Sequence, residues 1–312
     1  MLNPGDIFFN LTGLFLLIAV GYAAVKLHIL PASSTKLLSS LLMQITLPAT
    51  VLTSLVRPFD PTFIQDGVLM VVLGTALFLL YGLLSFLLAP LFRVPQGRRG
   101  VWIFSSTFSN NGFMGFPVAL ALFQEQGLAL AIFLSIPFNF LAYTMGPKLM
   151  CMDHEAEDSG PAPSWRSILL TSVNCATVLG LVMYLTQLSI PSVLSAPLTY
   201  LSNVTTPLSM LVTGMNLTGG KARDLLRDRD AFSLSFMRLI LLPVITWAIL
   251  RLLPISNPLV VGVMLIIMSM PAASIGAILA ESYHADKEFA ARTVFVSSLL
   301  CLITLPLISL LL

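Results

Sequence analysis

The sequence predicts an all-helical protein that crosses a membrane ten times, built from two five-helix repeats inserted in opposite orientations. Three observations support this fold class: a shortage of charge, ten long apolar stretches and a weak internal repeat. Hydrophobic residues make up 57% and charged residues 10% of the 312 residues, against roughly 25% charged residues in soluble domains. We therefore expect an integral membrane protein embedded in the lipid bilayer, and the small net charge of +2 argues against a nucleic-acid partner.

Each apolar stretch is long enough for a transmembrane helix, which needs about 20 residues. The first residues carry neither a basic region nor a small-residue cleavage site, so we expect no removable signal peptide. Two connectors, 148–167 and 218–231, are long and dense in charge, which indicates solvated loops. Numbered in chain order, the ten expected segments are 7–27, 34–55, 67–92, 100–123, 127–147, 167–188, 193–215, 231–253, 258–281 and 289–311.

The positions of Lys and Arg predict the orientation. With ten helices, both termini share one side of the membrane, and of the 16 Lys and Arg residues only Arg57 and Arg251 fall on that side. Because short cytoplasmic loops collect positive charge, we expect both termini outside and the central loop in the cytoplasm. The predicted location is the plasma (inner) membrane, in a multi-pass arrangement.

Sliding the chain over itself by 159 residues reveals the repeat. "QITLPATVL" (44–52) then matches "NVTTPLSML" (203–211), and Gly21 meets Gly180. Each half holds five helices, an odd number, so the second half must be inverted relative to the first, as in many secondary transporters. The predicted division is a first repeat at 1–147, a cytoplasmic loop at 148–166 and an inverted second repeat at 167–312.

Segment 4 is interrupted by the stretch "SNNGFMGFP" (109–117). Pro117 removes a backbone donor and obstructs the preceding turn, and Gly112 lets the chain unwind or another backbone approach. Asn110 and Asn111 bring amides that can bond freed backbone groups or a ligand. Unwound backbone is tolerated within a bilayer only where protein or water satisfies it.

Segment 9 carries a comparable break in "IMSMPAASIGAI" (267–278), which contains Ser269, Pro271 and Ser274. Two breaks at matching depth in the two halves point to a substrate site. The alternative is a pair of kinked helices held together by the asparagine side chains. The prolines of segments 2 and 7, Pro48 and Pro207, are more simply explained as kinks in scaffold helices.

The whole chain resembles the auxin efflux carrier family, in its prokaryotic branch. The resemblance is carried by "NNGFMGFPVALALF", "YLSNVTTPLSMLVTGMNLTG", "MSMPAAS" and "VFVSSLLCLITLPLISLL". It implies a carrier of malonate or another carboxylate, with a fold like that of the bile-acid sodium symporters and with segments 4 and 9 crossing at their unwound centres. It also implies a scaffold of segments 1, 2, 6 and 7, a mobile transport domain of segments 3–5 and 8–10, and a homodimer through scaffold segments 2 and 7. In segment 6, Asn174-Cys175 stands where relatives often have Asn-Pro.

No catalytic or metal constellation is visible. His28, His154 and His284 fall in or beside loops without ligand spacing, and the three cysteines are scattered. Nucleophile–base, zinc and phosphate-binding motifs are absent from the sequence. We therefore expect no enzyme activity, no cofactor and no metal.

Charged residues are rare within the segments. Glu281 and Arg238 lie near the cytoplasmic ends of segments 9 and 8, where the simplest expectation is that each side chain reaches the interface. No carboxylate lies deep in segments 3, 4, 5, 8 or 10, so coupling through a buried acid is unsupported. Asn139 and Tyr143 are about one turn apart and either face the site or bridge two helices.

Together these observations predict a secondary transporter that exports a small organic anion, a carboxylate, by elevator-type alternating access. The alternative is a channel or membrane sensor on the same scaffold. The carboxylate is expected to bind at a neutral site, held by helix N-termini and amides without a fixed cation, so that an inside-negative potential favours its export. The predicted substrate-binding residues are Asn110, Asn111, Gly112, Pro117, Asn139, Ser269, Pro271 and Ser274.

Overall fold

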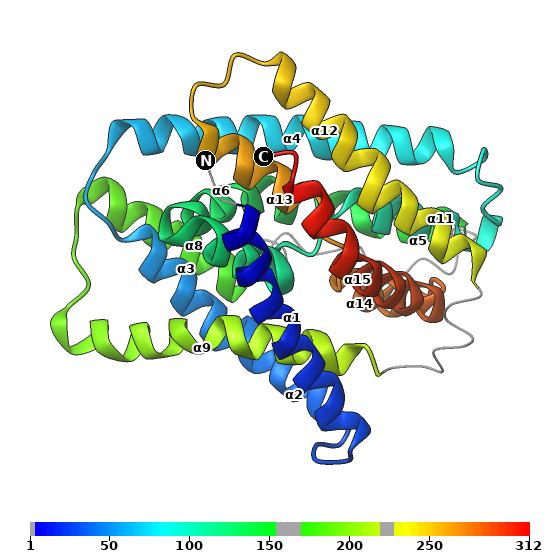
Figure 1. Ribbon diagram of the computed structural model, residues 1–312, viewed down its shortest axis with the longest axis horizontal. Coiled ribbons are helices and arrows are strands. Elements are labelled where there is room, and N and C mark those ends of the chain that lie inside the picture. The colour runs from blue at the N-terminus through cyan, green and yellow to red at the C-terminus, as the bar shows by residue number, and fades with distance from the viewer. Residues whose placement is uncertain (1–3, 154–169, 219–227) are drawn as a thin grey trace.

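The structure, a computed structural model, describes residues 4–153, 170–218 and 228–312 (Figure 1). In these ranges the chain is helical apart from connectors and one isolated pairing of two residues, which confirms the all-helical prediction. Most of the two expected polar loops lies outside the described residues. The helices are α1 (Pro4–Lys26), α2 (Ser34–Leu41), α3 (Leu47–Leu55), α4 (Pro61–Leu88), α5 (Gln96–Thr107), α6 (Phe116–Met150), α8 (Ser172–Thr186), α9 (Ser192–Asn216), α11 (Arg229–Phe236), α12 (Leu242–Leu252), α13 (Pro258–Met268), α14 (Ile275–Ser282) and α15 (Lys287–Ser309).

Six helical stretches within the described ranges are long and apolar enough to cross a bilayer, as expected of a multi-pass membrane protein. The count is below ten partly because segment 9 is divided into α13 and α14, of 11 and 8 residues, each shorter than a bilayer-spanning helix. Ten crossings therefore remain a prediction. The six stretches are Ile7–Lys26, Ser34–Leu55, Pro61–Leu88, Asn111–Asp153, Arg229–Leu252 and Lys287–Ser309.

Three of the helical segments widen into a single π-helical turn just before a proline. A proline inside a helix has no N–H to donate, and its ring collides with the carbonyl four residues earlier. A π-turn relieves that collision locally, and such turns are frequent at functional sites. By contrast, Pro207 of segment 7 lies within the continuous helix α9. The π-turns are Leu42–Thr46 before Pro48, Asn111–Gly115 before Pro117 and Met237–Leu241 before Pro243.

The long helix α6 contains a sharp break at Gln124, whose φ of 56° lies in the left-handed region. The break separates Phe116–Phe123, which completes segment 4, from residues 125–150, which form segment 5. The sequence placed the boundary between these segments at 123–127, and the structure agrees. Segment 5 ends at Met150, slightly beyond the expected 147.

Helices α1 and α9 cross at very short range because each has a glycine at the crossing. A Cβ added to Gly21 would strike the carbonyl of Leu211, and one added to Gly214 would strike the carbonyl of Ile18. Small residues that allow two backbones to approach are typical of helix pairs in membranes. The contact therefore depends on these two glycines.

Several helix ends lie toward the left-hand side of Figure 1, and residues from them line a polar pocket. The main-chain amide of Asp60 donates to the hydroxyl of Tyr184 at 2.8 Å. The side-chain amide of Asn257 donates to the carboxylate of Asp66 at 2.6 Å. Arg57 donates to the carbonyl of Glu125 at 3.3 Å. The starts of α4 and α13, the end of α8 and the break within α6 therefore lie at one end of the molecule.

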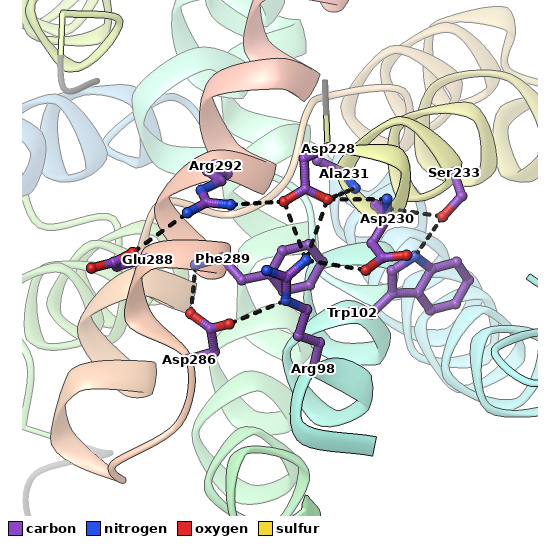
Figure 2. A network of polar contacts seen from close by, with 10 residues as sticks. All are labelled: Arg98, Trp102, Asp228, Asp230, Ala231, Ser233, Asp286, Glu288, Phe289 and Arg292. Atoms are coloured by element: carbon purple, nitrogen blue, oxygen red, sulfur yellow. Dashed lines mark hydrogen bonds and ion pairs between the residues drawn. The ribbon is translucent and has the colours of Figure 1, made fainter. Parts of the chain in front are cut away.

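An ion-pair cluster joins three helix N-termini (Figure 2). The three helices, α5, α11 and α15, begin toward the right-hand side of Figure 1. Asp228, which caps α11, lies 3.2 Å from Arg98 of α5 and 3.0 Å from Arg292 of α15. Arg98 also pairs with Asp230 at 3.1 Å and with Asp286, the cap of α15, at 3.3 Å. Burial lowers the pKa of Arg98, but the three carboxylates outweigh it and the net pKa is raised.

Candidate functional site

The interruptions in segments 4 and 9 lie against each other as a short antiparallel pair. The amide of Asn110 donates to the carbonyl of Pro271 at 2.8 Å, and the amide of Ala273 donates to the carbonyl of Phe108 at 3.0 Å. Proline has no amide hydrogen, so Pro271 serves only as an acceptor here. The two unwound strands thus satisfy each other's backbone groups in a fully buried place. We call this pair, residues 108–110 and 271–273, the crossover.

Arg238 lies directly behind the crossover. Its side chain is fully buried and donates four hydrogen bonds of 3.0–3.1 Å to main-chain carbonyls. Its guanidinium also lies 5.3 Å from the ring centre of Tyr81. Helix C-termini expose unpaired carbonyls and a partial negative charge, which a guanidinium can satisfy. The acceptors are Ser106 and Thr107 at the end of α5, and Met268 and Met270 at and just beyond the end of α13.

The expectation that Arg238 reaches the cytoplasmic interface is therefore wrong. The helix that carries it begins at Arg229, nine residues earlier, which corresponds to about 13 Å of helix. At that depth the guanidinium of Arg238 bonds to the carbonyls at the ends of α5 and α13. The sequence shows one arginine in an apolar segment, but not the carbonyls that come to it from other segments.

A cavity of about 160 Å³ lies beside the crossover. Its described lining combines amides and hydroxyls with apolar side chains and contains no charged residue. Five of the eight predicted site residues contribute to this lining. They are Asn110, Asn111, Gly112, Asn139 and Ser274.

Asn110 connects the two halves of the site. Its side-chain carbonyl accepts from the amide of Phe113 at 3.3 Å and so caps the π-turn that begins at Asn111. Its Nδ2 donates to the hydroxyl of Ser274 at 3.1 Å. The residue therefore holds the start of one half-helix to the start of the other.

Asn111 has an unused donor. Its Oδ1 accepts from the hydroxyl of Ser109 at 2.6 Å, whereas its buried Nδ2 has no hydrogen-bond partner among the residues that the structure describes. The residue is 1% exposed and lines the cavity. A buried amide without a partner costs about 1–3 kcal/mol, so this group favours a cavity occupant that accepts a hydrogen bond.

Asn139 both lines the cavity and bridges two helices, so the two alternatives for this residue coincide. Its Nδ2 donates to Oδ1 of Asn174 in α8 at 2.7 Å. Tyr143, one turn further along α6, also lines the cavity. Asn139 therefore connects segment 5 to segment 6 next to the candidate site.

The other three predicted residues belong to the frame of the site rather than to the cavity wall. Pro117 lies in the first turn of α6, after the π-turn. Ser269 is buried and donates to the carbonyl of Leu265 at 2.6 Å. Pro271 provides the carbonyl that pairs with Asn110.

The sequence reading missed the part of the cavity wall that comes from segments 2 and 6. Gln44 and Ser172 line the cavity and are hydrogen-bonded to each other, with the Ser172 hydroxyl donating to Oε1 of Gln44. Gln44 lies in the π-turn before Pro48. An amide beside a helix-disrupting proline was the available signal, but it was interpreted as part of a scaffold kink.

Comparison with known proteins identifies the family of the chain. The profile of the family described as "Membrane transport protein" matches residues 6–174 and 161–309, which together span most of the chain. The chain belongs to this family. The resemblance to the auxin efflux carriers is thereby confirmed, and the protein is a membrane transporter.

Two archaeal relatives in this transporter family match almost over their full length. One, an uncharacterized transporter of Methanocaldococcus jannaschii, is 26% identical over 294 residues, covering 94% of each chain. The other, an uncharacterized transporter of Methanothermobacter thermautotrophicus, is 27% identical over 291 residues, covering 93% of each chain. The family is one of transporters rather than enzymes, which is consistent with the expectation from the sequence.

Proposed function

We propose that this membrane transporter is a secondary carrier that exports a small organic anion, a carboxylate, across the plasma membrane by an elevator-type mechanism. One observation carries the proposal: Asn111, whose buried Nδ2 has no partner among the described residues, lies in the wall of a cavity whose described lining contains no charged residue. A carboxylate oxygen is an acceptor that this donor lacks.

Two helix starts reinforce the preference for an anion. Helical structure restarts at Asn111, in the π-turn that leads into α6, and again at Ile275, the first residue of α14. Both residues line the cavity. The N-terminus of a helix carries roughly half a positive charge and donors without intrahelical partners. Two such ends beside one cavity favour a negative group without a fixed cation in the cavity wall.

The size and lining of the cavity indicate a small substrate with an apolar body. A volume of about 160 Å³ is close to that of an engineered cavity of about 150 Å³ that binds benzene. Leu47, Phe116, Phe138 and Ile275 contribute apolar surface to the same cavity as the amides. A carboxylate attached to a few carbon atoms fits both surfaces.

The proposed architecture is ten spans in a five-plus-five inverted repeat. The antiparallel pairing at the crossover supports it, because an axis in the membrane plane relates two such halves in opposite directions. Connectors that gather at two opposite ends of the molecule support it as well. His28 and Gln187, which follow α1 and α8, both have a positive φ and are separated by the repeat offset of 159 residues, which also supports the repeat.

In this proposal the cavity lies between a stationary scaffold and a moving domain. Gln44 and Ser172 belong to scaffold segments 2 and 6, and Asn110 and Ser274 belong to transport segments 4 and 9. The hydrogen bond between Asn139 and Asn174 crosses that boundary and must break when the domain moves. A homodimer through segments 2 and 7 leaves the scaffold fixed while each transport domain slides.

Export follows from the charge of the cargo. Moving one negative charge outward across an inside-negative membrane is favoured by about 2.3 kcal/mol per 100 mV. No carboxylate lines the cavity in the described part of the chain, so the membrane potential is a simpler driving force than a proton relay.

Purified protein in liposomes loaded with labelled pyruvate, lactate, malonate or succinate tests this function. We expect saturable efflux that increases as a potassium–valinomycin gradient makes the interior more negative. External unlabelled substrate should accelerate the exit of label, which distinguishes a carrier from a channel or a sensor. Flux that follows a sodium or proton gradient and ignores the potential would contradict the export mechanism, and flux of cations alone would contradict the anion site.

A further inference from the structure

Arg238 is a buried cation without a carboxylate partner in the described part of the chain. All four of its hydrogen bonds go to main-chain carbonyls, and the ion pairs between described residues lie elsewhere. Of the described charged residues, only Arg238 and Asp228 are buried, and Asp228 is paired with Arg98 and Arg292. The positive charge of Arg238 is therefore stabilised by carbonyl dipoles but is not neutralised.

That charge is permanent. Arginine does not lose its proton in proteins, and the partial negative charges at the ends of α5 and α13 further favour the cation. The crossover thus carries one formal positive charge just behind it, although the cavity wall itself is uncharged.

Arg238 also moves with the crossover if the proposed elevator is correct. It lies in segment 8, its hydrogen bonds go to segments 4 and 9, and it stacks on Tyr81 of segment 3. All four segments belong to the proposed transport domain. Within the described residues, its guanidinium forms no hydrogen bond or cation–π contact with the proposed scaffold.

We infer that Arg238 is the counter-charge of the cargo, so that the transport domain is neutral when it carries a monoanion and positive when it is empty. This inference rests on the proposed function. Its consequence is that the membrane potential acts on the return of the empty domain. An inside-negative potential pulls the positive, empty domain back to the inside, whereas the loaded domain crosses with little net charge.

The net charge moved in each cycle is the same with this counter-charge as without it. One negative charge still leaves the cell, but the voltage-dependent step is the return rather than the export step. Neutralising the charge during the loaded step also avoids part of the cost of carrying an ion through a low-dielectric region.

Comparing exchange with net efflux in liposomes separates these steps. With labelled pyruvate inside and saturating pyruvate outside, the domain is loaded in both directions. We expect that exchange to change less than twofold between 0 and −100 mV. Net efflux into pyruvate-free medium includes the empty return, so it should rise several-fold, within the limit of about 50-fold that 100 mV imposes on one charge. Malonate, a dianion, leaves the loaded domain with one negative charge, so its exchange should depend on voltage.

Two variants separate the charge of Arg238 from its structural role. Arg238→Lys keeps the charge and should keep pyruvate exchange independent of voltage, even if the altered geometry slows it. Arg238→Gln removes the charge, so pyruvate exchange should slow several-fold at −100 mV, because the inward loaded step now opposes the potential. Loss of structural support alone slows both variants without creating a voltage response in exchange.

The native protein decides the question even if Arg238→Gln does not fold. Pyruvate exchange that varies with potential as strongly as net efflux overturns the counter-charge and leaves the proposed carrier intact. A folded Arg238→Gln protein whose exchange stays independent of voltage also overturns it. Absence of any carboxylate flux overturns the proposed function, and this inference with it.

Discussion

The amide of Asn110 donates a 2.8 Å hydrogen bond to the carbonyl of Pro271, and this bond joins two interrupted helices from opposite halves of the chain. Unwound backbone inside a bilayer is tolerated only when its polar groups find partners. Here the crossover pairs part of the unwound backbone, and Arg238 donates hydrogen bonds to the main-chain carbonyls at the helix ends behind it. Within the described residues, Nδ2 of Asn111 is left without a hydrogen-bond partner, and Asn111 contributes to the wall of the cavity.

The first prediction concerns Asn111. Asn111→Ala removes the unused donor and also the acceptor of the Ser109 hydroxyl. Ser109→Ala loses the same hydrogen bond but keeps the donor. Ser109→Ala should lose about 1 kcal/mol of stability and Asn111→Ala no more than that, because the unpartnered donor is removed together with the hydrogen bond. Carboxylate efflux should fall more than tenfold only in Asn111→Ala. Thermal unfolding in detergent and liposome efflux measure the two effects, and equal loss of flux in both variants would indicate a purely structural role.

The second prediction concerns the crossing of α1 and α9. An added methyl group at Gly214 meets the carbonyl of Ile18, whereas one at Gly13 of α1 meets no atom within 4 Å. Gly214→Ala should therefore destabilise the protein by about 1–3 kcal/mol through overpacking. Gly13→Ala should be neutral or stabilising, because alanine is the better helix former by about 1 kcal/mol. The melting temperatures of Gly214→Ala and Gly13→Ala check this expectation. Similar values would show that α1 and α9 can move apart at little cost in stability.

The third prediction concerns orientation. Gln124 and Arg93 are both exposed. Gln124 precedes Glu125, which is bonded to Arg57 at one end of the molecule, whereas Arg93 lies five residues before Arg98 of the ion-pair cluster at the other. In a variant without Cys151, Cys175 and Cys301, we expect Gln124→Cys to react with a membrane-impermeant maleimide in intact cells. Arg93→Cys should react only after the cells are permeabilised. The reverse pattern would overturn the charge-based orientation.

The interruptions of the helices were predictable from the sequence because their cause is local. Pro117 and Gly112 disfavour regular helix wherever they are placed, and Asn110 and Asn111 stand beside them. The approximate limits of most helices follow from apolar length in the same way. The break at Gln124 also fell where the pattern placed a segment boundary.

The contacts of the site were not predictable in this way, because they depend on how distant segments meet. The acceptors of Arg238 come from 30 to 132 positions away in the chain, and one sequence does not place them. Gln44 and Ser172 are separated by 128 positions, yet they form one wall of the cavity. Which amide keeps a free donor is likewise a result of tertiary packing.

The fourth prediction concerns the ion-pair cluster of Figure 2. Asp228 caps α11 and pairs with Arg98 and Arg292, and its side chain is only 4% exposed. Asp228→Ala should cost about 1–3 kcal/mol, because it removes the cap of α11 and the carboxylate that Arg98 and Arg292 share. Glu288, whose side chain is 78% exposed, also pairs with Arg292, but such surface pairs contribute about 0–1 kcal/mol. Glu288→Ala is therefore the control. Equal melting temperatures for the two variants would contradict the expectation that Asp228 contributes more to stability than Glu288.

The last prediction tests the binding of the anion without transport. A ligand that binds only the folded protein stabilises it by about 2.7 kcal/mol at 100 times its dissociation constant, so a bound carboxylate should raise the melting temperature of the purified protein. Asn111→Asp keeps an acceptor for the Ser109 hydroxyl but replaces the free donor with a group that is negative when ionised. At pH 8 we expect this variant to fold and to show no melting-temperature increase with pyruvate or malonate. Asn10→Ala is a matched control, because it also removes an amide, one that donates to the carbonyl of Ala121 outside the cavity wall. This control should respond to the ligands as the native protein does. A full ligand response in Asn111→Asp would show that the carboxylate binds elsewhere.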